Sequence, residues 1–316
     1  MKLENKRILI TGGSGFLGKV VTEKFEKRGA IVFVPRSRHY NLVDYKAVRR
    51  LFGTVMPQIV VHSAAFYGGI WINQKYPGRI YFKNLVMGAN IFEMCRIWDV
   101  EKVVTIGTAC SYPGNLEGDL SEENLWDGAC HESVRCYGTT KKMLCVQAEA
   151  YKKQYDLDSI HLILTNLYGH GDTYNPERSH VAAALIRKFV EAKMNGEDKV
   201  EVWGSGKPIR EFLYVDDAAE AIVRSTEMYS DTEPMNVGTG IGTSIKELVE
   251  LIAEITGFKG EIVWDSSKPD GAVRKVLNVS KMNKVLNWSP KISLREGLGK
   301  TIPWFESNYT SAIQRW

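Results

Sequence analysis

Tyr137 and Lys141 stand four residues apart in "RCYGTTKKML", and their types and spacing could support proton transfer. On a helix, residues with this spacing share one face. A lysine ammonium beside a phenol favours the phenolate, so we expect Tyr137 to exchange a proton near neutral pH. The hydroxyl of Thr108, at the end of an earlier apolar segment, could hold a carbonyl oxygen against that phenol. Because the same spacing is common on amphipathic helices, the pattern needs support from other segments.

A glycine-rich turn near the start of the chain gives that support. Gly12, Gly15 and Gly18 follow the apolar run "RILIT" and open a segment with helical periodicity. Glycines at this position allow backbone N–H groups to approach a pyrophosphate, which a helix N-terminus favours. We therefore place Gly12, Gly15, Phe16, Leu17 and Gly18 at a dinucleotide site, the alternative being a glycine turn without a ligand.

Two arginines indicate which dinucleotide is bound. A protein that prefers NAD would place an acidic residue after the second strand, whereas this chain has "VPRSRHYN" there. Arg36 and Arg38 can accommodate a 2′-phosphate, so we expect NADP(H). The alternative is that both arginines are ordinary solvated surface residues.

Apolar runs alternate with helical patterns along the first half of the chain, as in a parallel sheet covered by helices. We expect an α/β fold: a Rossmann-like doubly wound parallel sheet with a smaller α/β substrate-binding domain. The predicted boundaries are 1–166 for the NADP-binding domain, with a later return near 211–230, and 167–316 for most of the nucleotide-sugar-binding domain. The expected strands are 7–11, 30–34, 58–64, 102–108 and 159–165, and the expected helices begin after Gly15 and at Asp44 and cover 84–98 and 137–155.

Composition excludes several classes of protein. The 316 residues carry 41 basic and 37 acidic side chains, a net charge of +4 without a concentrated basic patch. Such a chain is not expected to bind nucleic acid. It also lacks a signal-peptide core and an apolar run long enough to cross a bilayer, so we expect a cytoplasmic protein with no membrane contact.

The cysteines are predicted to be free thiols. Their number is odd and CxxC spacing is lacking, which argues against a disulfide framework and against structural zinc; we expect no metal site. The five are Cys95, Cys110, Cys130, Cys136 and Cys145.

Together these motifs resemble the extended short-chain dehydrogenase/reductase superfamily. "HSAA" at 62–65, with Ala64 and Ala65, corresponds to the adenine side, and "KNLVMGAN" follows at 83–90. Three later segments, "TNLYGHGDTYNPERSHV", "VWGSGKPIREFLYVDDAA" and "KPDGAVRK", are similar to the GDP-L-fucose synthase family. That family consists of NADPH-dependent enzymes that epimerise and reduce GDP-4-keto-6-deoxy-mannose.

The resemblance implies catalytic roles for Cys110 and His180. A ketone at C4 acidifies the protons on C3 and C5, so inversion needs one group to remove a proton and another to deliver one. Cys110 and His180 occupy the base and acid positions, and Thr108 and Tyr137 would stabilise the enolate. Taken alone, Cys110 could be a packed thiol, and His180 could be a helix-start residue after the N-cap candidate Ser179.

The resemblance also implies contacts with the rest of the substrate and with the cofactor. Cationic side chains suit the pyrophosphate, and Arg187 could replace its neighbour in that role. For the substrate, the implied positions are Arg210 and Lys188 at the pyrophosphate, Val202 and Trp203 at guanine, and Asp270. Asn166 is implied to contact the cofactor, close to the sugar phosphates.

Departures from the family pattern leave the sugar open. Threonine replaces the usual serine at Thr108, His170 and Gly171 replace a proline–histidine pair, and 114–136 is unlike the usual loop. A colitose-type sugar, a 6-deoxy-heptose or plain C4 reduction are therefore alternatives. A dehydratase is disfavoured because Ala109 and Cys110 follow Thr108 where an acid is needed. A non-enzymatic NADP sensor is disfavoured because the tyrosine and lysine are both present.

Two helical segments predict the oligomeric state. Residues 84–98 and 142–155 carry more apolar positions than one sheet face requires. In the superfamily that this chain resembles, these helices pair as a four-helix bundle, so we expect a homodimer. The alternative is that the apolar residues of both helices pack only within the core of a single chain.

Overall fold

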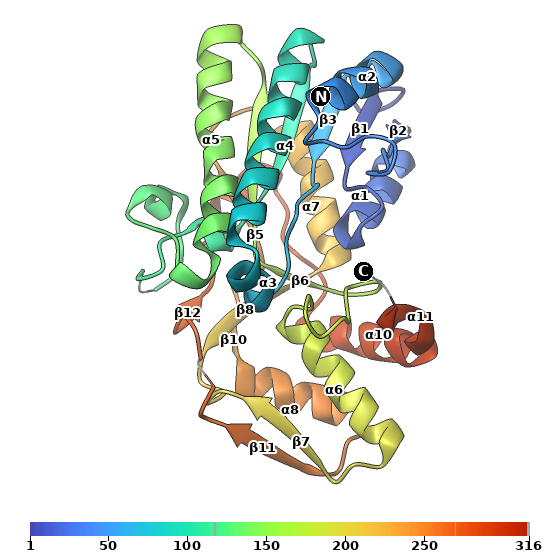
Figure 1. The fold of residues 1–316 in the computed structure, drawn as a ribbon, viewed down its shortest axis with the longest axis vertical. Helices are drawn as coiled ribbons and strands as arrows, with labels where there is room; N and C mark the ends of the chain where they lie inside the picture. The colour runs from blue at the N-terminus through green and yellow to red at the C-terminus, as the bar shows by residue number, and fades with distance from the viewer. Residues whose placement is uncertain (117, 269, 315–316) are drawn as a thin grey trace.

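A six-stranded parallel sheet forms the larger unit in this computed structural model, which describes residues 1–116, 118–268 and 270–314 (Figure 1). Pro269 of the "KPDGAVRK" segment therefore lies outside the described residues. The strand order is β2-β1-β3-β4-β5-β9, and it reverses direction between β1 and β3. In such sheets a ligand binds beyond the carboxyl ends of the strands at that reversal. The strands are β1 (Arg7–Thr11), β2 (Ile31–Phe33), β3 (Ile59–His62), β4 (Lys102–Thr108), β5 (Ser159–Leu164) and β9 (Met235–Val237).

Helices cover both faces of this sheet because successive strand residues point to opposite sides. Ile8 and Ile10 pack into one core and Leu9 into the other. Both faces are apolar, which produces the continuous apolar runs of a buried parallel sheet. One face carries α2 (Tyr45–Val55), α4 (Pro77–Ile97) and α5 (Arg135–Tyr155), and the other carries α1 (Phe16–Lys27), α7 (Val215–Met228) and α9 (Ser280–Leu286) (Figure 1).

Local sequence explains where two of these helices begin. Asp44 caps α2, since its carboxylate accepts a hydrogen bond from the Lys46 amide at 2.9 Å. The prediction for α4 was wrong at its start, because the helix begins seven residues before Asn84, at Pro77. Proline is well tolerated in the first helical turn, where its missing N–H has no partner to lose.

The smaller unit has its own sheets and its own core. Its main sheet has the order β10-β8-β12, with β6 also paired to β8, and β7 and β11 form a separate parallel pair. Its strands are β6 (Asn166–Tyr168), β7 (Lys199–Trp203), β8 (Ile209–Tyr214), β10 (Gly242–Ser244), β11 (Glu261–Asp265) and β12 (Arg274–Lys275). Its helices are α6 (Val181–Asn195), α8 (Ile245–Thr256), α10 (Leu294–Ser307) and α11 (Tyr309–Ile313).

The glycines and the proline of "VWGSGKPIREF" lie in a short turn between two strands. The segment contains the end of β7, this turn and the start of β8. Along β7 exposed and buried residues alternate, so only every second position is apolar and the strand signal is weak.

The chain returns from the smaller unit to the larger one. Helix α7 packs against α1, strand β9 pairs with β5, and α9 packs on α7. The division into two domains at residue 166 stays a prediction. Among the described residues, no helix combines the length and apolar character needed to cross a membrane.

Shorter elements complete the chain around the site. They are α3 (Ile70–Lys75) and the 3-10 turns η1 (Ala109–Ser111), η2 (Glu122–Trp126) and η3 (Glu132–Val134).

Candidate active site

Thr108 and Cys110 lie where β4 gives way to η1. The Thr108 hydroxyl oxygen accepts a hydrogen bond from the Cys110 amide at 3.2 Å, which caps the turn. Because that bond uses only an oxygen lone pair, the hydroxyl proton is still available to a ligand. Both side chains are partly accessible.

Helix α5 packs directly on this turn through Gly138. A Cβ atom on Gly138 would lie 2.2 Å from the Cys110 carbonyl oxygen and 3.0 Å from the Cys130 sulfur. The Ser111 hydroxyl also donates to the Gly138 carbonyl at 3.1 Å. This close approach brings the first turn of α5, with Tyr137, beside Cys110.

The pKa of Tyr137 is raised rather than lowered, which is opposite to the expectation from sequence. Burial is the main cause, and negative charge on Cys110 or Tyr67 would raise it further. The Lys141 ammonium lies 5.9 Å from the centre of the Tyr137 ring. Burial lowers the pKa of Lys141 to about 8. The resting phenol is therefore protonated and suited to donate a proton.

Two buried histidines near Lys141 are neutral. His62 and His161 form 2.8 Å hydrogen bonds with Thr11 and Thr105, respectively. Burial, and secondarily the charge of Lys141, lower the pKa of each imidazole to about 3. They therefore add no positive charge beside Lys141 at neutral pH.

His180 is the N-cap residue of α6. Its side chain is exposed, yet the protein around it limits hydration and lowers the pKa of the imidazole. Ser179 does not cap the helix, and its buried hydroxyl has no partner among the described residues. The loop 169–180 delivers His180 from the smaller unit towards the larger one.

Tyr67, which sequence reasoning missed, links these groups. Its ring stacks with Tyr137 at 6.5 Å between ring centres and with His180 at 6.0 Å. Side chains from β4–η1, α5, the segment after β3 and the loop before α6 thus meet at one place. No spacing in the sequence predicts that meeting, because Tyr67 and His180 are more than a hundred positions apart.

A cavity of about 360 Å³ lies at the strand-order reversal, where the cofactor site is predicted. Gly12 has φ +75°, and a Cβ there would lie 2.8 Å from the Ala64 amide nitrogen; a Cβ on Gly18 would lie 2.1 Å from the Gly12 carbonyl. Only glycine fits these positions, because a side chain would collide with neighbouring backbone. The cavity is lined by Gly12, Ser14, Pro35, Ser37, Tyr40, Asn41, Leu42, Val43, Ala64, Ala65, Phe66, Lys83 and Met87.

Other predicted cofactor residues surround this cavity without lining it. Arg36 and Arg38 are exposed on either side of the lining residue Ser37. The Arg38 side chain donates to the His39 ring at 3.0 Å. Phe16 and Leu17 open α1 behind Gly15.

Arg210, on β8, brings a cation near Cys110. It is half-buried, and its guanidinium donates to the Ile209 carbonyl at 2.7 Å. Burial lowers the pKa of Arg210, while negative charge on Cys110 and Asp270 opposes that lowering. Asn166 lies on the neighbouring strand β6, where its amide donates to the Glu211 carbonyl at 2.9 Å.

Trp203 is the exposed aromatic residue of the predicted guanine site. The Trp203 side chain is 63% exposed, and the ammonium groups of Lys188 and Lys268 lie over its ring at 5.7 and 5.4 Å. Val202 is buried in the core of the smaller unit, so only its main chain could face a base. Asp270 accepts two 2.7 Å hydrogen bonds from Ser205 and so fixes the turn after Trp203.

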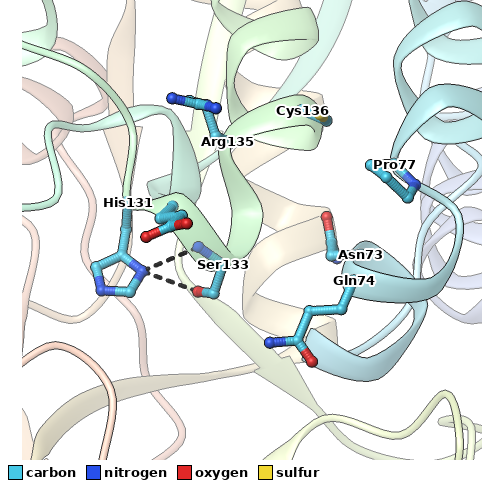
Figure 2. Close-up of a pocket in the computed structure, with 8 residues that line it drawn as sticks. Asn73, Gln74, Pro77, His131, Ser133, Arg135 and Cys136 are labelled. Atoms are coloured by element: carbon cyan, nitrogen blue, oxygen red, sulfur yellow. Dashed lines mark hydrogen bonds between the residues drawn. The ribbon is translucent and has the colours of Figure 1, made fainter.

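A second cavity, of about 520 Å³, lies between α3 and the start of α5. Figure 2 shows Asn73 and Gln74 on one side and His131, Ser133 and Arg135 on the other. The hydroxyl and amide of Ser133 bond to His131 Nδ1 at 2.8 and 3.3 Å. Cys136 lines this cavity, directly before Tyr137.

Comparisons with known proteins agree over almost the whole chain. The family model described as the NAD dependent epimerase/dehydratase family matches residues 8–238. The GDP-L-fucose synthase of Escherichia coli is 37% identical, covering 97% of this chain and 98% of that one. GDP-L-fucose synthase 1 of Arabidopsis thaliana is 36% identical, covering 98% and 95%. A GDP-L-colitose synthase of Yersinia pseudotuberculosis is 29% identical, covering 95% and 97%.

Two solved structures are similar as well. A GDP-L-fucose synthetase from Naegleria fowleri bound to NADP has a TM-score of 0.90 and 29% identity, covering 98% of this chain and 97% of that one. A GDP-6-OMe-4-keto-L-xylo-heptose reductase from Campylobacter jejuni also has a TM-score of 0.90, with 28% identity and coverage of 98% and 99%.

Proposed function

Since the chain belongs to the NAD dependent epimerase/dehydratase family, we propose for it an activity of the GDP-L-fucose synthase kind. The proposed substrate is GDP-4-keto-6-deoxy-mannose, epimerised at C3 and C5 and reduced at C4. One observation carries this proposal: two side chains able to transfer protons lie near the Tyr137 phenol. Cys110 lies close to the phenol, and the His180 ring stacks on Tyr67, which in turn stacks on Tyr137. A plain reductase needs only the tyrosine.

In the proposed epimerisation, Cys110 acts as the base. Its thiolate removes the acidic proton on C3 or C5, and the electron pair of the broken C–H bond passes to O4. Thr108 and Tyr137 donate hydrogen bonds to that oxygen and stabilise its charge. The imidazolium form of His180, which the lowered pKa makes the minor form at neutral pH, then gives a proton to the opposite face of the carbon, and the carbonyl at C4 re-forms.

In the proposed reduction, Tyr137 acts as the acid. NADPH, when bound, supplies the hydride to C4. Tyr137 donates its phenolic proton to O4, which its raised pKa keeps ready at neutral pH. Thr108 holds the same oxygen in both reactions, so the sugar need not move between them.

The residues around the smaller cavity fit a dinucleotide. Gly12 and Ser14 line this cavity directly before the N-terminus of α1, which favours a pyrophosphate. Lys141, Ala64, Ala65, Asn166, Phe16 and Leu17 complete the proposed cofactor set. Arg36 and Arg38 are proposed to hold a 2′-phosphate, so kcat/KM with NADPH should exceed that with NADH.

The GDP portion is proposed to lie along the smaller unit. Trp203 offers an open ring for guanine to stack on, and Lys188 beside it supplies positive charge for the phosphates. Arg210 would hold the phosphate nearest the sugar, since it also lies near Cys110. Asp270 acts by fixing the turn that follows Trp203.

The cysteine variant Cys110→Ser tests the proposed base. In deuterated water with GDP-4-keto-6-deoxy-mannose, we expect deuterium incorporation at C3 and C5 to fall by about 10²-fold or more, while binding is retained. Cys136→Ser is the matched control, because Cys136 is half-buried one residue before Tyr137 and has no proposed catalytic role. Unchanged exchange in Cys110→Ser would refute the base role.

Related GDP-4-keto sugars form the second candidate substrate class. The colitose synthase and the heptose reductase show that relatives of this chain act on such sugars. A panel of these substrates in the same assay decides between them. Retention of both Cys110 and His180 favours a substrate that is epimerised over plain reduction.

We also propose that the protein is a homodimer paired through α4 and α5. These helices lie side by side on one face of the sheet (Figure 1). Phe82, Ala89 and Ile97 recur on one face of α4 and are exposed, as are Val146 and Ala150 on α5. A second copy would cover this apolar surface, which a monomer leaves in water.

A further inference from the structure

Tyr67 lies between the two groups that the proposed mechanism uses as acids. Its ring is tilted by 29° from that of Tyr137 and by only 10° from that of His180. The segment that carries it runs from β3 down to α3, at the boundary of the two units (Figure 1). The side chain is 39% exposed, so packing within the core does not account for its position.

Both backbone polar groups of Phe66, the residue before Tyr67, are hydrogen-bonded. The Phe66 amide donates to the Asn84 side-chain oxygen at 2.8 Å, and the Asn84 amide group donates to the Phe66 carbonyl at 2.9 Å. Asn84 also donates to the Ile80 carbonyl in its own helix at 2.9 Å. This reciprocal pair ties the segment to α4, a long and rigid element.

The residues after Tyr67 are held as well. The Asn73 amide group donates to the carbonyls of Gly68 and Gly69 at 3.2 Å each. A Cβ on Gly69 would lie 3.2 Å from the carbonyl oxygen of Ser179, so this turn approaches the residue before His180. The segment is therefore tied to α4 and α3 and lies against the residue before His180.

The contacts of Tyr67 with Tyr137 and His180 are made by its ring. Burial and the charge of Asp172 raise the pKa of Tyr67, and Arg178 lowers it less. A neutral hydroxyl with a raised pKa is a poor third base beside Cys110. An aromatic ring held parallel to an imidazole, in contrast, restricts the orientation of that imidazole.

We propose that Tyr67 is a positioning residue that fixes the angle of the His180 imidazole relative to Tyr137, and so the face of the sugar to which His180 can deliver a proton. This inference rests on the proposed function for the role of His180 as proton donor. It adds that the ring, and not the hydroxyl, of Tyr67 sets the balance between epimerisation and reduction.

The first arm of the test needs no substrate. In protein with labelled histidine, the His180 ring signal is identified by its loss in His180→Asn. Tyr67→Phe should leave that signal near its wild-type position, whereas Tyr67→Leu and Tyr67→Met should move it by removing the ring current. Two non-aromatic variants are used, and the melting temperature of each is measured to establish that it is folded.

The second arm measures products. With GDP-4-keto-6-deoxy-mannose and NADPH, Tyr67→Leu should lose epimerisation by about 10- to 100-fold, the effect of misplacing a reacting group by about 1 Å. Reduction should fall much less, so product with an unchanged C3 or C5 accumulates, and Tyr67→Phe should restore the wild-type ratio.

The outcomes separate this inference from the proposed function. An unmoved His180 signal in both non-aromatic variants would overturn the positioning role, as would an unchanged ratio of products in an active enzyme. If the wild type turns over none of the GDP-4-keto sugars, the proposed function fails, and the first arm still decides whether the Tyr67 ring lies against His180.

Discussion

Burial sets the protonation states of the side chains around Tyr137. It raises the pKa of the Tyr137 phenol, lowers that of Lys141 to about 8, and keeps His62 and His161 neutral. Lys141 is thus the cation of this part of the site, and its charge depends on pH within a range that assays can reach.

The pH dependence of cofactor use tests that state of Lys141. Lys141 is proposed to bind the cofactor in its charged form. Because its pKa is about 8, kcat/KM for NADPH should fall as the pH rises through about 8. Lys141→Arg keeps its charge throughout, so its profile should lack this alkaline limb even if its activity is lower. The same limb in both proteins would assign it to another group.

The packing of Gly138 gives a steric prediction. Gly138→Ala places a methyl group 2.2 Å from the Cys110 carbonyl oxygen, so α5 and η1 must move apart. We expect kcat to fall by about 10- to 100-fold, since displacement of a reacting group by about 1 Å has that effect. The control is Gly299→Ala in α10, where an added methyl group meets nothing within 4 Å. Equal activity of the two variants would contradict the close packing.

At the residue scale the sequence selected candidate residues but gave the wrong protonation tendency for one of them. Spacing and strand ends were enough to select Thr108, Tyr137 and Lys141 as candidates. The predicted direction of the Tyr137 pKa shift was wrong. Burial raises this pKa more than the charge of Lys141 lowers it, and only the fold reveals burial. Tyr67 was missed, since its contacts with Tyr137 and His180 join segments far apart in the chain.

Among the elements, β8 connects the two units through a buried carboxylate. Glu211 is fully buried, and its oxygens accept hydrogen bonds from the backbone amides of Thr239, Gly240 and Leu277. Its own carbonyl accepts the Asn166 amide. Glu211 therefore fixes the strand that presents Arg210 to the site.

Removing this carboxylate should destabilise the protein. Glu211→Ala removes the acceptor of three backbone amides, of which that of Leu277 is buried and those of Thr239 and Gly240 are half-buried. A buried group left unsatisfied costs about 1–3 kcal/mol. We expect the free energy of unfolding to fall by about 3–5 kcal/mol in urea titrations. Glu201→Ala, at an exposed position on β7, should change it by less than about 0.5 kcal/mol. A loss no larger than that of the control would mean that water replaces the carboxylate.

The strands of the larger unit were predictable where the pattern of neighbouring residues in the sequence determines the element. Buried parallel strands must be apolar on both faces, which produced the runs at β1, β3, β4 and β5. The start of α4 and the strands β7 and β8 were not predicted. Proline and glycine mark those positions, and whether they end an element or begin one depends on partners elsewhere in the chain.

The whole molecule consists of a larger unit, built on the six-stranded sheet, and a smaller unit, and the candidate site lies at their boundary. Each contributes part of the proposed machinery: Thr108, Cys110 and Tyr137 come from the first, and His180 and Arg210 from the second. Helices α4 and α5 lie side by side on one face of the larger unit (Figure 1).

The proposed dimer follows from the exposed apolar residues of α4 and α5. Phe82 is 58% exposed on α4, so Phe82→Asp should place a charge in the interface and yield a monomer. Light scattering should give twice the 35.6 kDa chain mass for the wild type and a single chain mass for the variant. Met194→Asp, at a position 60% exposed on α6, should remain dimeric. A wild type of single chain mass would show that the apolar residues of both helices serve only the core.

Product analysis in deuterated water tests the central claim most directly. The protein is incubated with GDP-4-keto-6-deoxy-mannose and NADPH, and the product and its labelled carbons are identified by NMR. If Cys110 and His180 move protons as proposed, the product is GDP-L-fucose with deuterium at C3 and C5 and protium at C4. A C4-reduced product with protium at both C3 and C5 would contradict the account and show a plain reductase.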